Sequence, residues 1–210
     1  MEGRNTGGIG EGVGDSELRS VVAKFGGTSM GDATAISKVA DIVAGGGGLI
    51  VAVVSATSGT TDKLIALGEA ALGGGKLKTA APFLWEEILQ GLVQKHEKIV
   101  TDLGVDLSFQ KFWEDIRKLA QGINMLGELS LSARDKLMSF GERISSQILA
   151  ALLTTRGAKA VAVDSYELIF TDNNFGEGNV NFEKTNAAIM EKVGGLIADG
   201  VVPVITGFVG

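Results

Sequence analysis

The sequence has 210 residues, of which 45% are hydrophobic, enough for one sizeable domain with a buried core. Its formal net charge of −6 and its pI near 4.9 supply no general attraction for phosphate backbones or anionic lipid surfaces, so we expect no nucleic acid and no membrane among its partners. The absence of cysteine excludes disulfides, thiolate catalysis and cysteine-based zinc sites, and a single histidine leaves little metal chemistry.

The first 20 residues, MEGRNTGGIGEGVGDSELRS, are rich in glycine and contain acidic residues but no apolar run. Neither a secretory signal nor a typical transit peptide has that composition. No later apolar run approaches the roughly 20 residues that span a bilayer. We therefore predict a flexible tail over residues 1–20 and a cytoplasmic location.

From the end of that tail, short apolar runs alternate with longer segments of helical period, the pattern of a parallel sheet covered by helices. The first run, residues 21–23, leads into KFGGTSM, and a helix is predicted after it. The apolar face of this helix holds Ile36, Val39, Ala40 and Val43. Residues 49–56, LIVAVVSA, are typical of a strand buried on both faces. Thr60, Thr61 and Asp62 are predicted to cap the helix that follows.

Residues 73–79 are predicted to form a loop, and the pattern over residues 82–131 is almost wholly helical. The simplest account is a helical insertion, about residues 76–131, that packs against the domain and has no part in catalysis. His96 lies in this segment among charged neighbours, and we interpret it as a solvated position on a helix face. A long helix that ends at Gly157 follows, and then a strand, a polar loop, a helix and a last strand.

The stretch VVAKFGGTSM places Lys24 at the carboxyl end of a predicted strand, with Gly26 and Gly27 in the turn after it. Open α/β sheets bind ligands at that edge, glycines let a backbone approach phosphate closely, and lysine adds a mobile positive charge. Thr28 and Ser29 either cap the next helix or donate hydrogen bonds to phosphate. No P-loop and no GxGxxG pattern is present, so the residues alone leave an anion-binding turn and a purely structural turn equally open.

Two further segments bring polar groups to the same region. Hydroxyl side chains gather after the second predicted strand, at Ser55, Thr57, Ser58, Thr60 and Thr61. Because parallel strands end at one edge of a sheet, these hydroxyls are predicted near Lys24, although turn and capping chemistry would also explain them. Glu142 lies in the apolar helix pattern SFGERIS, where it could pair with Arg143, face solvent or receive a substrate ammonium group.

Taken together, the motifs resemble the aspartate kinases of the amino-acid kinase superfamily. The resemblance rests on AKFGGTSM, VVSATSGTTDKLIAL, SFGERISSQILAALL, TDNNFGEGNV and VPVITGFVG, which occur in the family's order and approximate spacing and cover nearly all of residues 21–210. KFGGTS together with SFGER separates aspartate kinases from carbamate, acetylglutamate, glutamate 5- and uridylate kinases. The resemblance implies an α/β fold, a three-layer αβα sandwich with a mainly parallel sheet.

For the activity, the resemblance implies transfer of the ATP γ-phosphoryl group to the β-carboxylate of L-aspartate, with Mg²⁺, to give 4-phospho-L-aspartate. This is the first step of lysine, threonine and methionine biosynthesis. Lys24 would be the catalytic residue that contacts the transferring phosphoryl group. The residues implied at the nucleotide phosphates are Lys24, Phe25, Gly26, Gly27, Thr28 and Ser29. The residues implied around aspartate are Ser55, Thr61, Glu142 at the α-ammonium group, and Phe208. No metal-ligating residue is predicted.

In aspartate kinases, a segment resembling TTLGRGGSDYTA follows TGFVG and supplies an arginine for the substrate carboxylate and an aspartate near the nucleotide. We therefore expect residues 21–210 to be the N-terminal, substrate-side part of a catalytic domain, without the nucleotide half and without the ACT domains through which the full-length family commonly forms oligomers. Two alternatives stay open. One is a non-catalytic module that binds aspartate or pairs with a full-length subunit, and the other is the N-terminal part of a bifunctional aspartate kinase–homoserine dehydrogenase.

Overall fold

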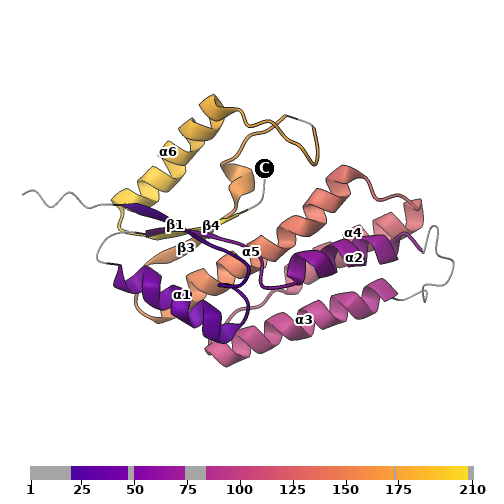
Figure 1. The fold of residues 1–210 in the computed structure, drawn as a ribbon, viewed down its shortest axis with the longest axis horizontal. Coiled ribbons are helices and arrows are strands. Elements are labelled where there is room, and N and C mark those ends of the chain that lie inside the picture. The colour runs from indigo at the N-terminus through magenta and orange to yellow at the C-terminus, as the bar shows by residue number, and fades with distance from the viewer. Residues whose placement is uncertain (1–19, 47–49, 74–83, 173, 208–210) are drawn as a thin grey trace, which may run out of the picture.

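The computed structural model describes residues 20–46, 50–73, 84–172 and 174–207, and its elements follow the predicted alternation (Figure 1). The strands are β1 (Val21–Phe25), β2 (Ile50–Val54), β3 (Ala160–Val163) and β4 (Val202–Thr206). The helices are α1 (Ala33–Gly45), α2 (Thr60–Ala71), α3 (Leu84–Leu103), α4 (Gln110–Leu126), α5 (Leu131–Thr155), the short η1 (Ser165–Glu167) and α6 (Phe182–Ala198). The predicted tail and the predicted loop over residues 73–79 lie almost wholly outside the described residues. None of the described helices is long and apolar enough to cross a membrane.

The strands form one parallel sheet in the order β1-β2-β4-β3. β2 lies inside the sheet and is buried along nearly its whole length, as its unbroken apolar sequence predicts. Parallel pairing puts the carboxyl ends of the strands at one edge, where Phe25 is level with Val54 and Val54 with Thr206. The turn after β1 and the loop after β2 are therefore neighbours, at the edge where such sheets bind ligands.

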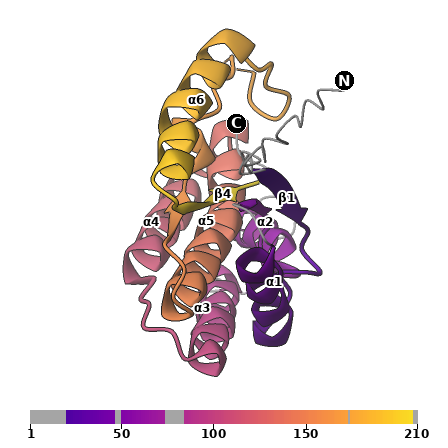
Figure 2. The ribbon, with the colours of Figure 1, turned by 90° about the vertical axis from the view of Figure 1, so that its left-hand side faces the viewer.

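Helices cover both faces of the sheet, which gives the predicted three layers (Figures 1 and 2). α6 lies on one face, where Val193 packs with Val51 of β2 and Val163 of β3. α1 and α5 lie on the other face, and their buried side chains, with Ile36 and Ile148 among them, form the main core with β2 and β4. The four apolar residues predicted for the first helix are all buried in α1, so that periodicity is confirmed.

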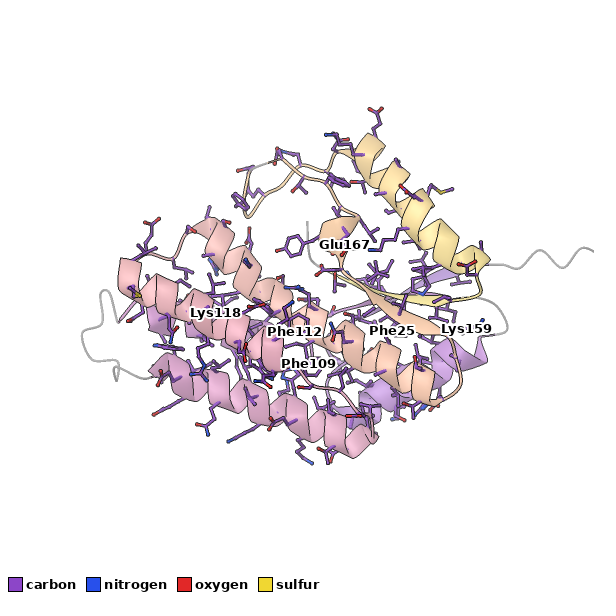
Figure 3. The ribbon with its side chains drawn as sticks, turned by 180° about the vertical axis from the view of Figure 1, so that it is seen from behind. Phe25, Phe109, Phe112, Lys118, Lys159 and Glu167 are labelled. Carbon is purple, nitrogen blue, oxygen red and sulfur yellow. The ribbon has the colours of Figure 1, made fainter. Side chains whose placement is uncertain are left out.

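The segment predicted as a helical insertion contains α3 and α4, which pack with α2 and α5 around a second core. Each of the four helices contributes at least one fully buried side chain, namely Leu64, Leu89, Ile116 and Phe140. Phe112 of α4, which is labelled in Figure 3, lies edge-on to Phe140 of α5, and their ring centroids are 6.0 Å apart. The α3–α4 segment is thus held by burial of apolar surface against α2 and α5, of which α5 also contacts the sheet.

The helix starts near the carboxyl edge differ from the prediction. Asp32 caps α1, accepting from the Ala35 N–H at 2.8 Å, so neither Thr28 nor Ser29 fills that role. The N-cap of α2 is Gly59, which has a left-handed φ of 71° and no side-chain capping bond. The prediction that hydroxyl or carboxylate side chains cap α2 is therefore wrong, because the Thr60 hydroxyl bonds to Thr57 instead.

Gly141 on α5 offers a direct test of how tightly the β2–α2 loop is packed. A Cβ atom at Gly141 would lie 2.7 Å from the Ala56 Cβ, closer than two carbon atoms can approach. We expect Gly141→Ala to lower the free energy of unfolding by about 1–3 kcal/mol through overpacking, measured by chemical denaturation. Gly122→Ala is the matched control, because its Cβ meets nothing within 4 Å on α4; it should raise stability by about 0.5–1 kcal/mol. Equal effects of the two substitutions would contradict the close packing.

Candidate active site

A cavity of about 500 Å³ opens at the carboxyl edge of β1 and β2. Three parts of the chain line it: the turn after β1, the β2–α2 loop with the start of α2, and the middle of α5. The lining residues are Lys24, Gly27, Thr28, Ser55, Ala56, Thr57, Ser58, Gly59, Thr61, Asp62, Met138 and Glu142. Segments more than 100 residues apart in the sequence therefore meet in one hollow, as the parallel sheet requires.

The turn after β1 leaves room over its glycines. The Met30 N–H donates to the Gly26 carbonyl at 3.1 Å, and the Met30 side chain is fully buried, which anchors the turn. A Cβ at Gly26 would meet nothing within 4 Å, and one at Gly27 would lie 3.6 Å from its nearest neighbour. Lys24 is exposed, and its Nζ makes no hydrogen bond or ion pair with any described residue. The turn thus presents open backbone and a free cation to the cavity.

Glu142 is the buried carboxylate of the cavity. Its side chain is on α5 with only 4% of the residue exposed, and its Oε1 accepts from the Ala56 N–H at 3.2 Å. Its Oε2 has no hydrogen-bond partner among the described residues. Burial raises the pKa of this carboxyl to about 7, because the charged form has lost water without a full set of partners. A bound cation would supply the missing partner.

Arg143, the neighbour that could have neutralised Glu142, points elsewhere. Its Nε lies 2.7 Å from the Asp164 Oδ2, and its guanidinium stacks over the rings of Phe112 and Phe140 at 5.0 and 5.2 Å. Cation–π contacts of this kind add to the ion pair. Of the three alternatives for Glu142, pairing with Arg143 and facing solvent are therefore excluded, and the third, a substrate ammonium group, stays a prediction.

The β2–α2 loop is fastened to α5 by its backbone. The Ser55 N–H continues the sheet ladder to the Phe25 carbonyl at 3.0 Å, and the Ser145 hydroxyl donates to the Ser55 carbonyl at 2.8 Å. With the bond from Ala56 to Glu142, two successive residues of the loop are held by α5. Ser55 and Thr61 line the cavity, at the hydroxyl positions that the sequence predicts.

His96 corrects the sequence-based interpretation. It is fully buried rather than solvated, because it lies four residues after Leu92 and three before Ile99, on the apolar stripe of α3. Its Nδ1 lies 2.7 Å from the Leu92 carbonyl and its Nε2 lies 3.0 Å from the Thr57 hydroxyl. Burial lowers the pKa of His96 to about 4. Its spacing along α3 was the signal in the sequence; the charged residues beside it obscured that signal.

Not every predicted residue reaches the cavity. Lys24, Gly27, Thr28, Ser55, Thr61 and Glu142 line it. The Phe25 side chain is buried in the main core, and Phe25 and Ser29 border a separate hollow over α1 and are not among the residues that line the cavity. Gly26 lies in the turn but not among the lining residues. Phe208 lies outside the described residues.

A larger hollow of about 970 Å³ lies between α4, α5, η1 and the 171–180 loop. Lys118 on α4 and Glu167 on η1, both labelled in Figure 3, are among its lining residues. It contains none of the residues predicted to bind phosphate or aspartate. The charged groups on its wall are of both signs, and Arg143 and Asp164 there already pair with each other.

The family model described as "Amino acid kinase family" matches residues 19–210. The chain belongs to the amino acid kinase family. Aspartokinase 1, chloroplastic, of Arabidopsis thaliana is 35% identical over 205 residues, which are 93% of this chain and 34% of that protein. Lysine-sensitive aspartokinase 3 of Escherichia coli is 29% identical, over 74% of this chain and 33% of that protein.

Solved structures of the amino acid kinase family agree with the fold. The crystal structure of E. coli aspartokinase III in complex with aspartate and ADP matches with a TM-score of 0.73 at 25% identity, over 90% of this chain and 40% of that chain. Clostridium acetobutylicum aspartate kinase matches with a TM-score of 0.69 at 26% identity, over 90% of this chain and 39% of that one. The chain thus spans about a third of its curated relatives and two fifths of these structures.

The buried position of His96 predicts how it titrates. Since its pKa of about 4 lies below the usual 6.5, the unfolded chain binds this proton more readily between those values, so this group lowers stability as pH falls from 6.5 toward 4, by up to about 3 kcal/mol. In nitrogen-15 NMR, the single imidazole should stay neutral at pH 5.5, with its proton on Nδ1. A titration midpoint near 6.5 in the folded protein would contradict this.

Proposed function

We propose that this chain carries the acceptor side of an aspartate kinase, which transfers the ATP γ-phosphoryl group to the β-carboxylate of L-aspartate and gives 4-phospho-L-aspartate and ADP. The observation that carries the proposal is one cavity with an unpaired buried carboxylate oxygen on Glu142 and a free cation on Lys24. An amino acid with a carboxylate side chain has the complementary groups, an ammonium and an anion. The complex of E. coli aspartokinase III with aspartate and ADP supports this choice.

In the reaction, a β-carboxylate oxygen attacks the γ-phosphorus, and the bond from phosphorus to the bridging oxygen of ADP breaks. The carboxylate is already ionised near neutral pH, so no general base is needed. The remaining task is to align two anions and to reduce their repulsion. We assign this to Lys24 as the catalytic residue, with the Gly26–Gly27 backbone and Thr28 beside the phosphates; Ser29, at the separate hollow over α1, would contribute only through its backbone.

For the acceptor, we assign the α-ammonium group to Glu142, whose Oε2 would gain its missing partner. Ser55 and Thr61 would donate hydrogen bonds to the substrate carboxylates, and the Phe208 segment would close the pocket. Mg²⁺ would arrive with ATP as part of the nucleotide substrate. Phosphate oxygens of the nucleotide and water would be among its ligands.

The wider role follows from this activity. The product would be the entry to lysine, threonine and methionine biosynthesis, in a cytoplasmic, homo-oligomeric enzyme with no nucleic acid or membrane partner. Because the chain spans about a third of its curated relatives, the nucleotide half would be supplied by residues outside it. Activity tests therefore belong in the full-length polypeptide.

The proposal is tested by an acceptor panel. Full-length polypeptide with ATP·Mg²⁺ and hydroxylamine should give a hydroxamate with L-aspartate, because hydroxylamine traps an acyl phosphate. Acetylglutamate, glutamate, carbamate and UMP, the acceptors of other kinases in this superfamily, should give no acceptor-dependent release of ADP at matched concentrations, a readout that also covers UMP, whose product hydroxylamine does not trap. Turnover with one of those acceptors and none with aspartate would overturn the assignment.

Loss of the cation is expected to affect the chemical step. Lys24→Ala in the full-length polypeptide should lower kcat for aspartate phosphorylation by at least about 10²-fold, the scale of one preorganised charge-stabilising group. Lys184→Ala, at an exposed position of α6, is the matched control and should leave kcat unchanged. Near wild-type turnover of the Lys24 variant would remove its catalytic role.

The raised pKa of Glu142 predicts a pH dependence of aspartate binding. Below pH 7 the carboxyl is mainly protonated and cannot pair with an ammonium group, so the Kd for aspartate should be about tenfold weaker at pH 6 than at pH 8. Calorimetric titration without ATP measures this. Glu142→Gln should bind aspartate weakly at both pH values and lose the dependence. An unchanged pH profile in that variant would show that another group is responsible.

A further inference from the structure

Helix α3 contacts the cavity loop through two consecutive polar residues, Lys95 and His96. The Lys95 Nζ donates to the Ser58 carbonyl at 2.5 Å and to the Thr60 hydroxyl at 3.1 Å. The His96 Nε2 lies 3.0 Å from the Thr57 hydroxyl. Thr57 and Ser58 are among the residues that line the cavity, so α3 bonds directly to its wall from behind.

These contacts form one directed chain of hydrogen bonds. The Leu92 carbonyl can only accept, so the His96 Nδ1 carries the proton and donates to it at 2.7 Å. The neutral ring must then accept at Nε2, and the Thr57 hydroxyl donates to it. Thr57 in turn accepts from the Thr60 hydroxyl at 2.6 Å, and Thr60 accepts from Lys95. Each polar group in the chain has a partner of the right kind.

The network holds the loop in a single arrangement. Thr57 and Thr60 are each only 1% exposed and their hydroxyls bond to side chains of α3, whereas Ser55 and Thr61 line the cavity and have no side-chain bond to α3 among the described residues. A one-residue shift of the loop would leave buried hydroxyls and the imidazole unpaired, which is costly in a low-dielectric interior. Apolar side chains could fill the α2–α3 interface equally well, but they would not fix the position of the loop. Packing alone therefore does not account for polar residues at Thr57, Thr60, Lys95 and His96.

The Lys95 cation is used on the loop rather than in an ion pair. It is half-buried and contacts no carboxylate among the described residues. Burial, and then the charge of Lys63, lower its pKa, yet a bond from an ammonium group to the Ser58 carbonyl is of the strong, charge-assisted kind. The next turn of the same helix offers a contrast, because the Lys98 side chain is 74% exposed and, among the described residues, pairs with Asp102 alone.

From this geometry we propose that Lys95 and His96 of α3 are positioning residues for the acceptor site, holding the β2–α2 loop so that Ser55 and Thr61 present their hydroxyls to the substrate. The segment expected to pack only would thus set the shape of the substrate loop. The identity of the substrate rests on the proposed function, whereas the control of the loop by α3 does not.

The test compares Lys95→Met with Lys98→Met in the full-length polypeptide. Lys95→Met removes the bonds to Ser58 and Thr60 and keeps an unbranched side chain, and it should raise KM for aspartate at least about tenfold, the loss expected for a single charge-assisted hydrogen bond. KM for ATP and kcat should change less than about threefold, Lys95→Arg should restore most of the affinity, and Lys98→Met should behave as wild type. Equal KM values for Lys95→Met and Lys98→Met would overturn the proposal.

Hydrogen exchange read by mass spectrometry gives a second readout that needs no activity. Without substrate, Lys95→Met and Thr57→Val should each speed exchange in the peptide that covers residues 56–61, where the Thr60 N–H donates to the Thr57 carbonyl. Lys98→Met should not. If wild type phosphorylates no aspartate but this pattern appears, the function fails and the positioning role stands. If neither Lys95→Met nor Thr57→Val changes the exchange of this peptide, the positioning role is overturned, whatever the activity.

Discussion

The site depends on one hydrogen bond, from the Ala56 N–H to the Oε1 of Glu142, which joins the loop after β2 to the middle of α5. Gly141 makes it possible, because any side chain there would collide with Ala56. The bond satisfies one carboxylate oxygen in a buried place and leaves the other without a partner among the described residues. Burial raises the pKa of this carboxyl to about 7, because the charged form is costly where only one oxygen has a partner. A cationic ligand would stabilise that charged form.

Lys24 and Glu142, two of the three ionisable side chains that line the cavity, come from different layers; the third, Asp62, lies in the first turn of α2. The sheet positions Lys24, because the parallel strand β1 ends at the ligand edge. The helix α5, which packs against the sheet, positions Glu142. Neither is neutralised by a described protein group, since Arg143 pairs with Asp164 and Lys24 is free. An amino acid with a second carboxylate, set against a phosphate chain, would use both charges. The α3 network adds a support from the far side of the loop, through residues that touch neither charge.

Sequence patterns predicted what depends on local order. Apolar runs and helical spacing identified β2, the buried face of α1 and the place of Lys24, because side-chain period and strand polarity are properties of one segment. The sequence patterns failed where the bonding partner is distant in the sequence. His96 bonds to Thr57, 39 residues away, and Thr60 accepts a hydrogen bond from Lys95 and does not cap α2. The sequence patterns also could not predict that the Phe25 side chain lies in the main core, because this depends on which face of β1 packs against α1 and α5.

The most direct test is the ionisation of Glu142 itself, followed by carbon-13 NMR of glutamate carboxyl groups in the full-length polypeptide and assigned with Glu142→Gln. Without ligand, this carboxyl should titrate near pH 7. Saturating L-aspartate should shift the midpoint downward, because the ammonium group stabilises the charged form. A midpoint near 4.5 that aspartate leaves unchanged would contradict a half-satisfied buried carboxylate and, with it, the assignment of the cavity to an amino-acid acceptor.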